Sequence, residues 1–360
     1  MSVLIRYRRA IAAVLAAMLG LLTMTLPPDL VDFAAAGDLL LQGRLGEVYA
    51  SAWNQAGPAQ LLISRLLMIG AAPDGTPWPP IVALWDAAFV AGAMWLCARL
   101  SRPVADVRRE AVAGLLALLW VCAPMPWNGH PAEILTPVLW AYAIVLQRRG
   151  RDLAAAGLLA LGIALAPWGI LAVPCLLAAA RPARAVRTGV IAVAGGVACY
   201  VPFALTGHFA MFRITWTVGG RTLASLLGIT EFTWWLRPVQ AAVVALGVAA
   251  IAWRLRRSES AFAAVPLAAG LLRVGTDPVE HPYYWYPVAV ASLLLLATAR
   301  RWVLAAAIAY AALLAESANW PAVGAAACLA LLAFGRKAPG EQAERGAGRY
   351  SPAVFQQQVG

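Results

Sequence analysis

Long apolar runs alternate along this chain with short polar segments that are rich in arginine. The runs predict membrane-crossing helices near 10–26, 79–98, 110–124, 131–147, 185–205, 238–253, 260–273, 284–299, 302–315 and 320–335. A further apolar stretch, 153–180, is interrupted at Pro167, which predicts a hairpin of two half-helices with Trp168 facing an outer cavity. Several runs are shorter than the ~20 residues of a perpendicular crossing, so we expect broken helices or helices bounded by polar cavities.

Composition supports an all-α, polytopic membrane protein, because 62% of the residues are hydrophobic, 12% are charged and mean hydropathy is +0.73. The ten runs and the two halves of the hairpin together predict about 12 crossings. A net charge of +11 suggests nucleic acid in a soluble protein. Here the uneven placement of the arginines explains the charge, so no nucleic-acid partner is expected. The five cysteines lie inside apolar runs and are interpreted as small core residues. No metal or cofactor is expected, with a divalent cation left open.

The basic residues set the predicted orientation, because cytoplasmic loops of membrane proteins carry an excess of Lys and Arg. With both termini in the cytoplasm of a multi-pass plasma-membrane protein, only six basic residues fall outside: Arg44, Arg65, Arg213, Arg221, Arg237 and Arg273. The chain then divides into a transmembrane domain, 1–335, and a disordered cytoplasmic tail, 336–360. Within the domain we expect a first external loop at 27–58 and an interfacial helix at 58–72.

Polar groups suited to chemistry gather on the predicted external side. All three histidines, His130, His208 and His281, fall there, together with the carboxylates Asp29, Asp32, Asp38 and Asp277. For any one histidine, a water-facing loop residue is the plainer interpretation. Their shared side favours a common external site.

The first external loop carries a motif, Asp32-Phe33-Ala34-Ala35-Ala36-Gly37-Asp38-Leu39-Leu40-Leu41-Gln42-Gly43-Arg44, followed by Val48-Tyr49. It resembles the first external loop of GT-C superfamily membrane glycosyltransferases, in particular polyprenyl-phosphate-mannose-dependent mannosyltransferases of the actinobacterial cell envelope. The resemblance covers 29–49 best and is weaker through 124–180 and 273–287. It implies a GT-C-like fold and a sugar, mannose or a pentose such as arabinose, moved from a polyprenyl-phosphate donor to a glycan or glycolipid acceptor outside the membrane. It also implies that Asp32 is the catalytic base.

Such a transfer needs a base for the acceptor hydroxyl and cationic or hydrogen-bonding groups for the leaving phosphate. Arg273 lies at a predicted helix end, and an arginine fork suits a phosphate. An interfacial arginine that reaches lipid headgroups is the alternative for this residue. His130 and His281 are predicted to share the phosphate or to orient the acceptor.

The remaining predicted site residues bind substrate. Glu133 follows His130 by three residues and so lies on the same helix face. The segment Tyr283-Tyr284-Trp285-Tyr286 resembles the tyrosine-rich segment after an acidic loop in GT-C enzymes, and aromatic faces stack on sugars. An aromatic belt at the membrane surface is the alternative. The predicted substrate-binding residues are Asp29, Asp38, Glu133, Trp168, Asp277, Tyr283, Tyr284 and Trp285.

Two other classes of protein stay open. A transporter or flippase of lipid-linked sugars uses the same aromatic and basic outer groove without a base, but it predicts polar residues across the membrane midplane. A non-catalytic scaffold for envelope assembly agrees with every feature except the Asp32 motif. Collection of the polar residues on one side favours the enzyme.

Overall fold

The computed structural model describes residues 3–24, 28–100, 107–122, 129–298, 305, 306 and 308. These residues are mostly helical, which confirms the all-α prediction, and their strands form one two-stranded sheet. The predicted helix 320–335, nearly all of 302–315, and the tail 336–360 lie outside the described residues.

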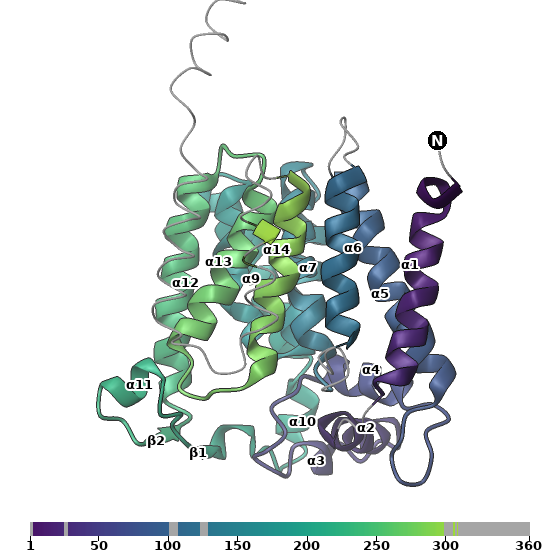
Figure 1. Cartoon of the computed structure of the whole chain (residues 1–360). Helices are drawn as coiled ribbons and strands as arrows, with labels where there is room; N and C mark the ends of the chain where they lie inside the picture. Colours follow the sequence, from purple (N-terminus) through teal and green to yellow (C-terminus); the bar gives the residue numbers. More distant parts are fainter. Residues whose placement is uncertain are drawn as a thin grey trace, which may run out of the picture.

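Nine long α-helices of the described part run side by side along one direction and form a bundle (Figure 1). They are α1 (Val3–Leu22), α5 (Pro79–Leu100), α6 (Val107–Cys122), α7 (Pro131–Arg148), α8 (Asp152–Leu165), α9 (Pro182–Ala198), α12 (Leu236–Leu255), α13 (Ala261–Thr276) and α14 (Tyr286–Thr298).

The predicted break in 153–180 is confirmed. Helix α8 ends at Leu165, and a 3-10 helix, η1 (Pro167–Ala178), follows after one extended residue. Proline cannot donate the next helical hydrogen bond, so carbonyl groups at the end of α8 need other partners. The Leu165 carbonyl accepts from the Gly57 N–H at 2.9 Å, and the Ile163 carbonyl accepts from the Tyr200 hydroxyl at 2.7 Å. Buried backbone at the break is thus satisfied by protein groups.

Helix α2 and several shorter elements gather at one end of the bundle, which we call the site end (Figure 1). The segment 27–58 is largely helical where a loop was predicted, because α2 begins at Pro28 and carries an apolar face against α4. The helix predicted at 58–72 is present as α4. The elements at this end are α2 (Pro28–Leu41), α3 (Leu45–Val48), α4 (Pro58–Leu67), α10 (Val201–Leu205), β1 (Thr215–Thr217), α11 (Leu223–Leu226) and β2 (Glu231–Thr233).

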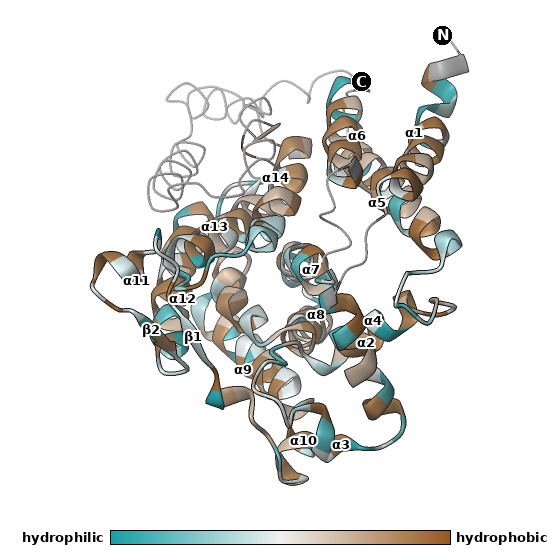
Figure 2. Ribbon diagram, turned by 60° about the horizontal axis from the view of Figure 1, so that its bottom comes forward, coloured by the Kyte–Doolittle hydropathy of each residue, from teal (hydrophilic) through white to brown (hydrophobic). Residues whose placement is uncertain are grey.

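Apolar residues cover outward faces of the bundle as well as its interior (Figure 2). Leu84 on α5 and Leu246 on α12 are each 71% exposed. An amphipathic helix of a water-soluble protein places polar residues there. By length and composition alone, two helices of the described part are able to cross a membrane, Pro79–Arg99 and Leu236–Leu255, so the predicted 12 crossings are not confirmed.

Candidate functional site

A cavity of about 720 Å³ opens at the site end of the bundle. Its walls come from α2, α7, η1, α12, α13 and the segment between α10 and α12, which are distant in the sequence. Aromatic rings make up much of the lining, and the polar groups among them are carboxylates, arginines, histidines and glutamines.

One polar contact in the cavity joins α2 to α7. Asp29 lies in the first turn of α2, and His130 is the residue immediately before α7. His130 Nε2 is 2.8 Å from Asp29 Oδ2. The hydrogen bond to His130 lowers the pKa of Asp29, against a smaller opposing effect of burial. Asp29 is therefore held ionised at neutral pH, with its side chain 36% exposed.

Gly129 brings these two helices together. Its φ of +82° favours glycine, and a Cβ built on it would lie 2.4 Å from the backbone nitrogen of Leu30. No side chain fits between the start of α7 and the start of α2. The Gln60 amide also donates to the Gly129 carbonyl at 3.4 Å.

Replacing Gly129 by alanine is expected to destabilise the protein by more than the ~1–2 kcal/mol of a positive φ alone, because α2 must also move away. Gly43→Ala is the matched control, since Gly43 has φ +74° but nothing within 4 Å of its added Cβ. Thermal unfolding of both variants in one detergent measures the difference. Equal losses for the two variants would contradict the packing argument.

His130, Tyr283 and His281 form a stack of three rings in the site. Tyr283 stacks on His130 with centroids 3.7 Å apart and on His281 at 4.9 Å, with both pairs nearly parallel. Burial lowers the pKa of His281, and the neighbouring His130 lowers it further. His281 is therefore neutral at neutral pH. The stack fixes the plane of the His130 ring, which in turn fixes the direction of its hydrogen bond to Asp29.

Arg273 and Glu133 form a buried ion pair. Both terminal nitrogens of the Arg273 guanidinium donate to the Glu133 carboxylate, Nη1 to Oε2 and Nη2 to Oε1 at 2.9 Å, and the side chains are only 5% and 4% exposed. The guanidinium carbon also lies 3.9 Å from the centroid of the Trp168 ring and 4.6 Å from that of Tyr284. The positive charge of Arg273 is thus largely compensated by Glu133 inside the protein.

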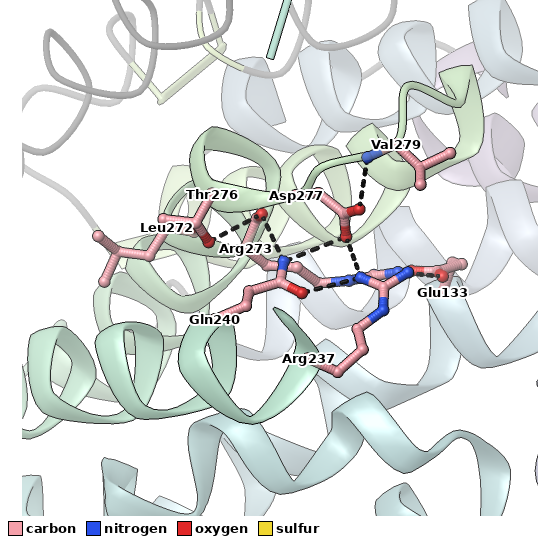
Figure 3. A network of polar contacts seen from close by, with 8 residues as sticks. All are labelled: Glu133, Arg237, Gln240, Leu272, Arg273, Thr276, Asp277 and Val279. Carbon is pink, nitrogen blue, oxygen red and sulfur yellow. Dashed lines mark hydrogen bonds and ion pairs between the residues drawn. The ribbon is translucent and has the colours of Figure 1, made fainter. Parts of the chain in front are cut away.

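A second arginine, Arg237 at the start of α12, lies beside the first (Figure 3). Its Nη1 donates to Asp277 Oδ2 at 2.9 Å and to Gln240 Oε1 at 2.8 Å. The Gln240 amide donates to the same Asp277 oxygen at 3.1 Å, and the Val279 N–H donates to Oδ1. Both carboxylate oxygens of Asp277 thus accept hydrogen bonds from protein groups. The Arg237 side chain, by contrast, is 35% exposed.

The structure brings most of the predicted site residues together. The cavity is lined by Asp29, His130, Glu133, Trp168, Arg273, His281, Tyr283 and Tyr284. Asp277 lies directly behind Arg237, outside the lining.

Three predicted residues lie elsewhere. Asp32 is exposed and does not line the cavity, whereas Asp29 and Phe33 of the same helix do. Asp38 pairs with Arg65 of α4 and so fastens α2 to α4. Trp285 is buried in the hydrophobic core. These three residues therefore lie outside the cavity lining.

Arg237 is the charged residue of the cavity lining that the sequence did not point to. Its signal was present, because it is one of the six arginines that the orientation left outside. The sequence contains no local pattern that shows that the turn before α12 packs against the end of α13. Within the described residues, no group of three His, Cys, Asp or Glu side chains is arranged to hold a metal ion.

Comparison with known proteins adds no relative: no protein-family model, curated protein or solved structure matches this chain. Function is therefore inferred from the cavity and from the chemistry of its residues.

Proposed function

We propose that this protein is a membrane glycosyltransferase that moves a sugar from a polyprenyl-phosphate donor to a glycan or glycolipid acceptor outside the membrane. The observation that carries the proposal is one aromatic-lined cavity that holds both an oriented carboxylate, Asp29, and a partly exposed guanidinium, Arg237. These are the base and the phosphate-binding group that the reaction requires.

The base in this proposal is Asp29, and the Asp32 of the loop motif is set aside because it is exposed away from the cavity. His130 binds Asp29 through Oδ2, which leaves Oδ1 for the acceptor hydroxyl. Asp29 takes the hydroxyl proton as the acceptor oxygen bonds to the anomeric carbon. The bond between that carbon and the phosphate oxygen breaks, and the lipid phosphate leaves with the electron pair.

Arg237 is assigned to the phosphate in preference to Arg273. Its hydrogen bonds to Asp277 and Gln240 both use Nη1, and Tyr284 and the Phe232 ring also contact the guanidinium. Because the side chain is still 35% exposed, it can approach a phosphate oxygen. Arg273 is turned to Glu133 by two hydrogen bonds and is almost fully buried. We assign it to positioning Glu133, Trp168 and Tyr284 around the sugar.

The proposal also includes the number of membrane crossings and the orientation of the protein in the membrane. Twelve crossings with a GT-C-like arrangement, cytoplasmic termini and an external site agree with the exposed apolar faces of the helices. They also agree with the arginine-rich turns around Arg149, Arg184 and Arg256, which lie at the helix ends away from the site residues. A lipid donor then reaches the site from the outer leaflet.

The second candidate is transport of lipid-linked sugars. It needs polar groups along a path through the membrane midplane. The polar residues of this cavity come from helix ends and turns: Asp29 from the start of α2, His130 from before α7, Arg237 from the start of α12 and His281 from after α13. Because these polar residues lie at one end of the bundle, the structure favours sugar transfer over transport across the membrane.

Purified protein mixed with polyprenyl-phosphate mannose or arabinose and envelope glycan fragments tests the proposal by product formation. Arg237→Gln is expected to weaken donor binding by about 1.5–3 kcal/mol, the strength of a hydrogen bond to a charged group. Arg213→Gln is the control, because Arg213 is exposed at the same end and lies outside the cavity lining. Donor movement across vesicles without any product would favour the transporter.

A further inference from the structure

The segment that joins α10 to α12 exposes large apolar side chains. Leu226 is 73% exposed, Leu227 70%, Phe212 57%, Trp235 53% and Trp234 48%. We call these five residues the apolar rim. In water, a patch of this kind marks a surface that contacts a membrane or another protein.

The rim continues the outward face of a helix suited to cross a membrane. Val239, Val243 and Leu246 are exposed on α12 at spacings of four and three residues, so they form one stripe that begins next to Trp235. Tryptophans at the end of such a helix mark the membrane–water boundary. Helix α11, which carries Leu226, lies at the outer edge of the bundle beside α12 in both views (Figures 1 and 2).

The segment is fastened to the body of the protein on its inner side. The Gly219 N–H donates to the Pro278 carbonyl at 2.9 Å, and the Arg221 N–H donates to Glu280 Oε1 at 2.7 Å. On the other side, the Gln55 amide donates to the Met211 carbonyl at 2.8 Å. These bonds hold the backbone in place, so the leucines keep pointing away from the protein.

The rim also borders the cavity. Phe212 and Trp234 line it while remaining about half exposed, and their ring centroids are 5.7 Å apart. We propose that the apolar rim is seated in the outer leaflet of the bilayer, so that the side of the cavity lined by Phe212 and Trp234 faces lipid. A lipid-linked substrate enters there with its tail still in the membrane. The inference rests on the membrane location in the proposed function, but not on glycosyl transfer.

Nitroxide labels placed singly at 226 and 227 test the proposal. The full chain, with its native cysteines replaced, is reconstituted in vesicles of phosphatidylethanolamine and phosphatidylglycerol, and collisions with oxygen and with a water-soluble nickel chelate are measured. Val243 is the lipid-facing control and Ser51, exposed at the site end, is the water-facing control. We expect both rim labels to match Val243, with oxygen favoured over nickel.

Two results would contradict the proposal that the apolar rim lies in the bilayer. Labels at 226 and 227 that respond like Ser51 would place the rim in water. Labels shielded from both reagents would place it against protein, such as a second copy of this chain. Accessibility of the Val243 label to the nickel chelate would contradict both the membrane location of α12 and the seating of the apolar rim in the bilayer. Loss of the transferase proposal leaves all these readings unchanged, because none of them uses activity.

Discussion

Asp29→Asn is expected to slow sugar transfer by about 10²–10⁴-fold, the usual contribution of a general base, while donor binding stays close to that of the unchanged protein. Asparagine keeps the shape of the side chain and a hydrogen bond to His130 but has no carboxylate to accept a proton. Transfer and donor binding measured on the same detergent-purified sample separate the two effects.

Asp32→Asn is the matched control, because it makes the same change on the same helix three residues further along, at an exposed position outside the cavity. It is expected to retain near-normal transfer. Full activity of Asp29→Asn together with loss in Asp32→Asn would return the base to the loop motif and contradict the geometric assignment. Equal activity of both variants would remove the base from the proposal and favour transport.

Glu133→Leu is expected to lower the free energy of unfolding by about 3–5 kcal/mol, because it leaves a buried guanidinium without its partner. Arg273 is 5% exposed and gives both of its hydrogen bonds across this pair to Glu133. Denaturant titration in mixed micelles measures the loss. The double variant Glu133→Leu, Arg273→Met is expected to recover most of it, because no buried charge remains.

An exposed pair provides the comparison. Arg184 and Asp152 bind through two hydrogen bonds with side chains 43% and 35% exposed. Asp152→Asn is expected to leave the free energy of unfolding almost unchanged, because exposed ion pairs contribute little to stability. If Glu133→Leu were no more harmful than Asp152→Asn, the Arg273 guanidinium would have to find water or another partner, and its role in positioning Trp168 and Tyr284 would be wrong.

Local signals in the sequence predicted several parts of the site well. The break at Pro167 follows from the missing N–H of proline, and it places Trp168 in the cavity as expected. Glu133 and His130 were paired by helical spacing, and both line the cavity. The tyrosines at 283 and 284 also lie there, although Trp285, next in the chain, turns into the core.

Other parts depend on contacts that no local pattern reports. The choice between Asp29 and Asp32 depends on how α2 is rotated, and the close approach of Leu30 to Gly129 sets that rotation. Arg237 gained its place because α12 begins beside the end of α13, where Asp277 and Gln240 hold it. Arg273 was predicted free for phosphate, but Glu133, 140 residues away in sequence, neutralises it.

By itself the sequence determined a mostly helical fold, its apolar segments and the set of polar residues from which a site is built. Those properties follow from composition and from spacing along one helix, where neighbours are three or four residues apart. Only the tertiary structure decided which of those polar groups line one cavity and which form ion pairs or hydrogen bonds with each other. A charge can serve a substrate only if no internal partner satisfies it, and that partner is fixed by packing between helices far apart in the chain.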